Sequence, residues 1–264
     1  MRYPVPRICA AIALTCATVA SGPALADEIR LLSAAAMQSV FKEIGGDFER
    51  TSGHKLRIAY GTIGGISGRV LAGERADVVI GSTLSFPELV QRARIDAASQ
   101  VTICTTGIGV VVPAGSAPPP MASSDDLKAA LLAAKVVVYA DPVRGGAAGV
   151  HIGRVLRDLG IADKLRQQIT LAAGGDVTEV TLAQGPGALG MTQTGEIVGK
   201  AGAQYAGPLP AAVQNYTTFV AGTPAGEQPS QAVLQFLAFL RGPEAAAAIR
   251  SKGMEQGGAH VTVR

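Results

Sequence analysis

At residues 73–80 the chain carries the stretch Gly73-Glu74-Arg75-Ala76-Asp77-Val78-Val79-Ile80. It ends in an apolar run bounded by turn residues, which is typical of a strand buried on both faces of a parallel sheet. The preceding segments read as alternating strands and helices, at Glu28–Leu32, Met37–Thr51, Lys55–Tyr60 and Ile66–Ala72. Strand and helix alternating at this spacing predict an α/β fold, with a mostly parallel sheet flanked by helices.

A second α/β unit follows a helix at Ser85–Arg94 and a strong strand at Ile108–Val112. Its helices are predicted at residues 124–134, 149–159 and 176–184, and its strands at residues 136–139, 169–171 and 188–191. The chain then ends with a predicted strand at residues 216–220 and predicted helices at residues 230–240 and 243–252. We expect two lobes joined by two crossover strands, near Thr105 and near Thr218. Residues 27–105 and 219–264 would form lobe one, and residues 106–218 lobe two. Such a hinge lets the lobes close on a ligand.

The first 26 residues have the three zones of a secretory signal peptide. Arg2 and Arg7 give a positive start, Ile8–Ala20 is apolar, and Ala24-Leu25-Ala26 is a small-x-small cleavage pattern. The apolar run is shorter than the roughly 20 residues that a spanning helix needs. We therefore expect export to the periplasm, cleavage near Ala26 and no stable membrane insertion afterwards.

The remaining chain is close to neutral and poor in reactive groups. Of the 23 basic and 20 acidic residues, only Arg2 and Arg7 lie in the leader, so 21 basic residues face 20 acidic ones. Nucleic-acid binding usually needs a clustered basic face, so no nucleic-acid partner is expected. Cys104 is the one cysteine after the leader and reads as a buried core residue. The three histidines are far apart, so we expect no metal site, and we expect no cofactor and a monomer.

Small, glycine-rich or hydroxyl-bearing loops follow four of the predicted strands, at Ser33–Ala36, Gly61–Ser67, Arg144–Gly149 and Gly174–Asp176. In open α/β sheets, ligands collect at these carboxyl ends. Small residues there let a ligand reach the unpaired N–H groups of a helix start, and those donors favour an anion. The candidate ligand-binding residues are Ala36, Met37, Thr62, Gly64, Gly65, Ser67, Arg69, Arg144, Gly146, Ala147, Ala148, His151, Gly175, Asp176 and Gln193.

Four side chains in or beside these loops could act on a ligand, and each has a structural alternative. Thr62 and Ser67 could donate hydroxyl hydrogen bonds or cap a helix. Arg144 could clamp a carboxylate through two N–H bonds or lie on the surface. His151 could donate to a carboxylate or shuttle a proton, or be a satisfied, partly buried ring.

Several motifs together carry a family resemblance: Leu32–Met37, Glu49–Lys55, Gly73–Ile80, Pro142–Gly149 and Gly242–Ala246. With these motifs the chain resembles the molybdate-binding-like (type II) branch of periplasmic substrate-binding proteins, which serve ABC importers. The resemblance covers nearly the whole chain after the leader. It implies a two-lobed fold, capture of a small anion and the membrane subunits of an importer as partners.

The ligand-facing positions depart from that branch. Met37 stands where its first serine is expected, Ile63 and Gly64 where the second is, and Gly190–Thr194 has no tyrosine. A tetrahedral oxyanion would lose several hydrogen bonds, and unpaired polar groups are costly in a closed cleft. The pattern therefore favours an organic carboxylate over molybdate.

Three loops look more similar to a subgroup that includes aconitate isomerase: Thr62–Gly65, Gly145–His151 and Gly207–Pro210. This resemblance implies that a proton is taken from one carbon and returned to another, which needs an acid/base with a pKa near the working pH. His151 is the candidate for that role, and Glu179 and Glu196 are alternatives.

Three hypotheses follow. The chain is a binding protein that delivers a small anion to an importer, an isomerase on the same scaffold, or an orphan protein with a vestigial cleft. The first predicts binding without turnover. The second predicts turnover that depends on an acid/base side chain.

Overall fold

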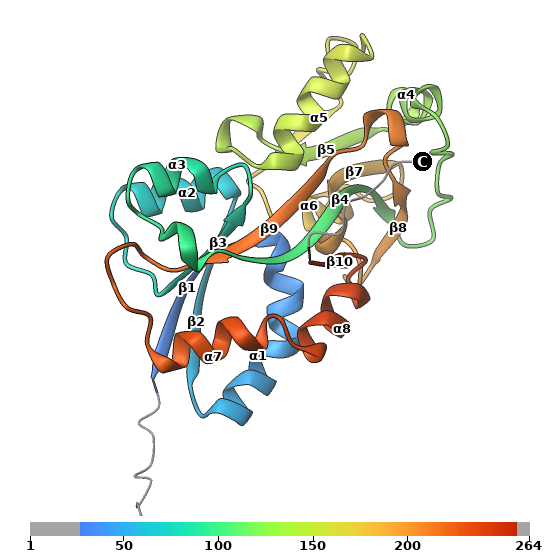
Figure 1. Ribbon diagram of the computed structural model, residues 1–264. Coiled ribbons are helices and arrows are strands. Elements are labelled where there is room, and N and C mark those ends of the chain that lie inside the picture. The colour runs from blue at the N-terminus through green and yellow to red at the C-terminus, as the bar shows by residue number, and fades with distance from the viewer. Residues whose placement is uncertain (1–26, 258–264) are drawn as a thin grey trace, which may run out of the picture.

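The computed structural model describes residues 27–257, so the predicted signal peptide lies outside the described residues. Within them, one curled mixed sheet has the strand order β2-β1-β3-β9-β4-β7-β5-β6, and β8 and β10 each pair with β4 (Figure 1). The strands are β1 Glu28–Ala34, β2 Lys55–Gly61, β3 Val78–Ser82, β4 Val101–Pro113, β5 Val136–Ala140, β6 Ile169–Ala172, β7 Ala188–Gln193, β8 Ala203–Pro208, β9 Tyr216–Gly222 and β10 Glu255–Gln256. The α-helices are α1 Gln38–Ser52, α2 Ile63–Leu71, α3 Phe86–Gln91, α4 Ser124–Ala133, α5 Ala147–Asp158, α6 Val177–Ala183, α7 Gln231–Phe239 and α8 Pro243–Ser251.

The first half of the molecule consists of β1–β3 with α1–α3, α7 and α8. Strand β1 pairs in parallel with both β2 and β3. Helix α1 buries Val40, Phe41, Ile44 and Phe48, which recur at helical spacing, on one side of the sheet. There Phe48 meets Phe236 of α7 edge-on, with ring centroids 5.2 Å apart. Helices α2 and α3 cover the other side with a smaller apolar cluster.

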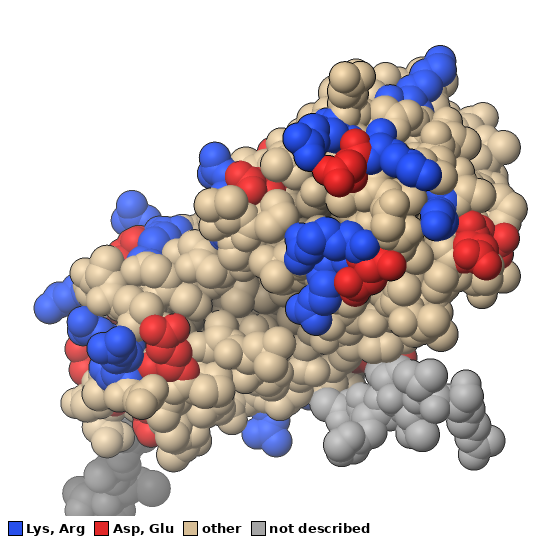
Figure 2. Space-filling model, turned by 90° about the horizontal axis from the view of Figure 1, so that it is seen from above, with Lys and Arg blue, Asp and Glu red and all other residues tan. Residues whose placement is uncertain are grey.

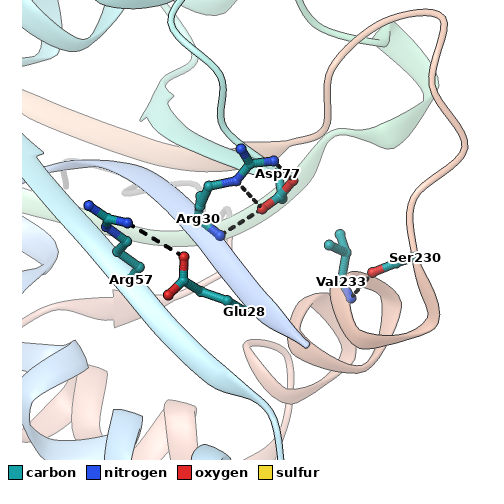
Figure 3. A network of polar contacts seen from close by, with 6 residues as sticks. All are labelled: Glu28, Arg30, Arg57, Asp77, Ser230 and Val233. Carbon is teal, nitrogen blue, oxygen red and sulfur yellow. Dashed lines mark hydrogen bonds and ion pairs between the residues drawn. The ribbon is translucent and has the colours of Figure 1, made fainter. Parts of the chain in front are cut away.

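The turn before β3 is tied to β1 by an ion pair (Figure 3). Arg30 donates to the Asp77 carboxylate from Nη2, at 2.8 Å, and from its backbone N–H, at 2.7 Å. Burial alone would raise the pKa of Asp77, but the hydrogen bonds and charge of Arg30 hold it below its usual range. Because the Arg30 side chain is 44% exposed, the pair contributes little stability and mainly holds the strand register.

The second half consists of β5–β8 with α4–α6. Strand β5 pairs in parallel with β6 and β7. Helix α5 packs its buried residues on one face, together with α4, and α6 packs on the other. Helix α4 begins with a capping box, in which Ser123 and Asp126 satisfy each other's backbone N–H groups.

Two strands, β4 and β9, run through both halves (Figure 1). They pair antiparallel, and Thr105 lies opposite Thr218, with the two hydroxyl oxygens 2.9 Å apart. These are the positions where crossover strands were expected. The lobe boundaries 27–105 with 219–264, and 106–218, remain a prediction.

The α/β architecture, with parallel strands flanked by helices, is as predicted, but some boundaries differ. Helix α2 begins at Ile63 rather than Ile66, because the Thr62 hydroxyl accepts the N–H of Gly65 and caps the helix. Helix α5 begins at Ala147 rather than Gly149. Strands β8 and β10 were not predicted. Cys104 is a free, buried cysteine, and burial raises the pKa of its thiol to about 12.

Candidate anion-binding site

A cavity of about 40 Å³ lies where the carboxyl ends of the strands from both halves meet. Its walls come from the segments that follow β1, β6 and β7, from the ends of β2, β5 and β7, from the starts of α2 and α5, and from β9. The lining residues are Ala35, Ala36, Gly61, Thr62, Ile63, Ala140, Gly146, Ala147, Ala148, Gly149, Gly174, Gly175, Thr192, Gln193, Glu196 and Phe219. The cavity is small in this closed arrangement of the two halves, so it suits a small molecule rather than a large one.

Among these lining residues there is no lysine, arginine or histidine. The outer face in Figure 2 shows basic and acidic side chains side by side in small groups, separated by neutral surface. Any attraction for an anion inside the cavity must therefore come from backbone dipoles rather than from a basic side chain in its wall.

Two helix starts, one from each half, reach the cavity without a side-chain cap. The 3₁₀ turn η1, Ala35–Met37, leads into α1, and its N-cap Ala34 offers no side-chain acceptor. Helix α5 is likewise preceded by Gly146, without a side-chain cap. Of the other helices, α2, α4 and α7 are capped by side chains, whereas α3, α6 and α8 are not. Since the first amides of a helix have no intrahelical acceptor, η1 and α5 leave N–H donors for an anion.

The amide of Gln193 presents an unpaired polar atom in the cavity wall. Its Nε2 donates to Thr217 Oγ1 at 3.1 Å. Its Oε1 is buried and has no hydrogen-bond partner within residues 27–257. A buried polar atom without a partner costs about 1–3 kcal/mol. Because an amide oxygen only accepts, this atom is suited to a ligand that donates a hydrogen to it, such as one with a hydroxyl or a protonated carboxyl group.

Glu196 is the one ionisable side chain in the cavity wall. It lies at the end of the 3₁₀ turn η4, Thr194–Glu196, directly after β7, and is 9% exposed. Thr192 Oγ1 donates to its Oε2. Lys200 pairs with Glu179 instead of Glu196. Burial raises the pKa of Glu196 to about 7, although the Thr192 hydroxyl and the charge of Lys200 act to lower it.

The two halves touch on opposite sides of the cavity. Thr62 Oγ1 donates to the backbone oxygen of Arg144 at 2.6 Å. The backbone N–H of Gly64 donates to the backbone oxygen of Gly145 at 3.0 Å. On the other side, Ser39 Oγ donates to the backbone oxygen of Gly195 at 2.8 Å. The structure is therefore a closed form, in which the cavity is bounded by both halves.

Seven of the candidate residues line the cavity: Ala36, Thr62, Gly146, Ala147, Ala148, Gly175 and Gln193. Two more, Gly64 and Arg144, lie at the contact between the halves, and the Arg144 guanidinium is turned toward Asp141, at 3.9 Å. Gly65 contributes its backbone N–H, which donates to the Thr62 hydroxyl and so caps α2.

The remaining candidates lie outside the cavity wall. Met37 is fully buried, with its sulfur 3.6 Å from that of Cys104. Arg69 pairs with Glu74 on the surface of α2, the helix that also carries Ser67. Asp176 accepts the N–H of Gly174 at 2.8 Å. His151 does not line the cavity, because its Nε2 lies 2.8 Å from the backbone oxygen of Val213.

The polar lining residues that sequence reasoning passed over are Thr192 and, except as an alternative acid/base, Glu196. Their signal is the polar run Thr192-Gln193-Thr194-Gly195-Glu196, which begins in the last two residues of the buried strand β7 and therefore lies at a carboxyl end.

The fold agrees with comparisons to known proteins. The model of the family described as bacterial extracellular solute-binding protein matches residues 29–255. An aconitate isomerase from Pseudomonas sp. is 26% identical over 253 residues, which cover 92% of this chain and 95% of that protein.

Two solved structures share the fold. The periplasmic molybdate-binding protein of Azotobacter vinelandii matches with a TM-score of 0.70 at 21% identity, over 86% of this chain and 98% of that one. The sulfate-binding protein SubI of Mycobacterium tuberculosis matches with a TM-score of 0.70 at 16% identity, over 88% of each chain. The expected molybdate-binding-like resemblance and the periplasmic-binding-protein fold are thus confirmed. The chain belongs to the family of bacterial extracellular solute-binding proteins.

Proposed function

We propose that this protein captures a small organic carboxylate in the cavity, by closure of the two lobes about β4 and β9. One observation carries the proposal: two uncapped helix starts, η1 and α5, approach a single cavity from opposite halves. Each supplies amide donors and the positive end of a helix dipole, which favour an anion. Closure would bring both sets of donors onto one ligand.

The lining favours an organic anion over an inorganic one. The two hydroxyls in the wall are already engaged, because Thr62 donates to Arg144 O and Thr192 donates to Glu196. A tetrahedral oxyanion, which needs donors on all sides, would meet alanine methyl groups and Phe219 instead. A carboxylate presents oxygens at one end and carbon at the other, and this mixture matches the wall.

The same proposal covers location and partners. The leader at residues 1–26 supports export to the periplasm, and family membership supports delivery of the ligand to the membrane subunits of an ABC importer. The lobes would comprise residues 27–105 with 219–264, and residues 106–218. Binding without turnover is the expected behaviour.

A second candidate function is isomerisation of aconitate, and Glu196 is the observation that favours it. Its carboxyl lines the cavity and has a pKa of about 7, which suits an acid/base at neutral pH. The Glu196 carboxylate would take a proton from one carbon, and its acid form would return a proton to the other end of the shifted double bond. His151 is less suited to this role, because its Nε2 lies against Val213 O. The aconitate isomerase from Pseudomonas sp. supports this alternative.

A thermal-unfolding screen tests the proposal. We would compare citrate, cis-aconitate, trans-aconitate, molybdate, sulfate and phosphate. A ligand present at 100 times its Kd should add about 2.7 kcal/mol to the free energy of unfolding. Stabilisation by a carboxylate is expected, whereas a response to molybdate or sulfate alone, or to none of the six anions, would contradict the proposal.

Turnover is tested separately. NMR spectra of cis-aconitate incubated with the protein report any conversion to the trans isomer. If conversion occurs, Glu196→Gln should abolish it and His151→Ala should retain it. Conversion that survives in Glu196→Gln would remove Glu196 from the acid/base role.

A further inference from the structure

The cavity proposed to bind an anion contains an acidic side chain, Glu196, in its own wall. Glu196 lies in the wall of the cavity, where the hydroxyl of another wall residue, Thr192, donates to its carboxyl and no basic side chain shares the wall. Two negative charges in one small, buried cavity disfavour each other strongly. An ionised Glu196 would therefore oppose the ligand that the helix starts attract.

The neighbouring charged groups do not neutralise Glu196. Lys200 pairs with Glu179 of α6. Asp176, at the start of the same helix, accepts the N–H of Gly174, and its charge adds to that of Glu179 in disfavouring ionisation of Glu196. The wall residues that β7 and η1 contribute, Thr192, Gln193, Ala35 and Ala36, carry no charge. The one effective way to remove the negative charge is protonation.

We propose that Glu196 is a proton-binding group of this site, so that the cavity takes up one proton with each anion that it binds. The inference rests on the proposed anion-binding function and specifies its chemistry. With Glu196 protonated, the two lobes close around one anionic ligand and a neutral carboxyl group. The acid form can also donate its hydrogen to a ligand oxygen, which adds a donor to a wall whose hydroxyls are engaged.

The raised pKa supports this assignment, because burial raises the pKa of Glu196 in the ligand-free protein to about 7. Near neutral pH the ligand-free protein is then a mixture of both forms, and a bound anion shifts it toward the acid form. Affinity should be greatest below pH 7. Well above pH 7 it should fall about tenfold per pH unit, since each unit lowers the protonated fraction tenfold.

Isothermal titration with propane-1,2,3-tricarboxylate tests the inference. This saturated tricarboxylate has no double bond to move, so turnover cannot add to the heat. Titrations at pH 7 and pH 8.5, each in buffers with different ionisation enthalpies, give the number of protons taken up. We expect about half a proton at pH 7 and close to one at pH 8.5.

Two variants complete the test. Glu196→Gln keeps the size and hydrogen bonding of a neutral carboxyl, and should bind without proton uptake and with an affinity that does not change with pH. Glu179→Gln removes a half-exposed carboxylate that pairs with Lys200 outside the cavity, and should keep the uptake. Proton uptake that persists unchanged in Glu196→Gln, or wild-type binding without uptake at pH 8.5, would overturn the inference while leaving anion binding intact.

The two proposals fail in different ways. If propane-1,2,3-tricarboxylate gives no heat, the same titration is made with the tightest-binding anion of the thermal-unfolding screen. If none of those anions binds between pH 5.5 and 8.5, the anion-binding function itself is wrong, and the proton uptake falls with it.

Discussion

Replacing Gly64 by alanine should separate the stability of the protein from its ability to close. Gly64 lies inside α2, where alanine is the better helix former by about 1 kcal/mol. In the closed structure, however, a Cβ atom at this position would lie 2.9 Å from Gly145 Cα and 3.1 Å from Gly145 O, in the opposite half. Because the contacting atoms are backbone, the halves must move apart to accommodate the methyl group.

The cost can be worked out from the contacts at this point. Separation breaks the hydrogen bond from Gly64 N–H to Gly145 O and weakens the one from Thr62 Oγ1 to Arg144 O. At about 0.5–1.5 kcal/mol each, the closed form loses about 1–3 kcal/mol. The open form loses nothing. Ligand affinity should fall about 5- to 150-fold, while the ligand-free protein remains as stable as wild type or becomes more stable.

Gly68→Ala is the matched control. Gly68 lies one turn further along α2, and a Cβ atom there would meet nothing within 4 Å. It should give the same gain in helix stability with unchanged affinity. Urea unfolding without ligand measures the stability, and calorimetric titration with the best-binding carboxylate measures the affinity. If Gly64→Ala binds as tightly as Gly68→Ala, the two halves do not meet at Gly64 and Gly145 in the bound state, and closure as described is wrong.

Three further predictions follow from buried groups. The pKa of Glu196 is raised from 4.5 to about 7, so the folded protein binds more protons than the unfolded chain between these values, and its stability should fall by about 3 kcal/mol as pH rises through that window. Glu196→Gln should remove this fall in urea unfolding at pH 5 and pH 8. Gln193→Met should weaken the binding of a hydroxyl-bearing carboxylate such as citrate about 5- to 150-fold in a titration, because it removes the acceptor Oε1 from the wall. Thr217→Val, which removes only the bonded partner of Nε2, should weaken it less. Cys104, with a buried thiol whose pKa is about 12, should react with a thiol reagent only after denaturation, and rapid labelling of the native protein would contradict its burial.

Most of the fold could be predicted because its strands are buried runs. Strands such as Val78–Ser82 and Val136–Ala140 are buried almost throughout, so they show as continuous apolar segments. Strand β8, Ala203–Pro208, was missed because it is half-exposed at the edge of the sheet, where pairing with β4 rather than burial defines it. Strand β10 has two residues, and tertiary pairing with Thr105 and Cys104 alone makes it a strand.

The position of the site was predictable, but its side chains were less so. The small-residue loops were found because strand-to-helix turns are visible in the sequence, and several of their members line the cavity. The direction of a side chain on a helix is set by the packing of that helix. His151 lies on the first turns of α5, yet packing turns its ring to Val213 O in another segment. Nothing in the local sequence around His151 contains this information.

The two candidate functions differ less than their names indicate. Both need an anion held by the amides of η1 and α5, and both place Glu196 beside it. If no acidic carbon–hydrogen bond of the ligand faces Glu196, this carboxyl can only gain a proton as the lobes close, and the protein binds and releases. If such a bond does face it, the ionised form of the same group can remove that hydrogen. A binding protein and an isomerase are thus separated on this scaffold by the ligand atom that lies against Glu196.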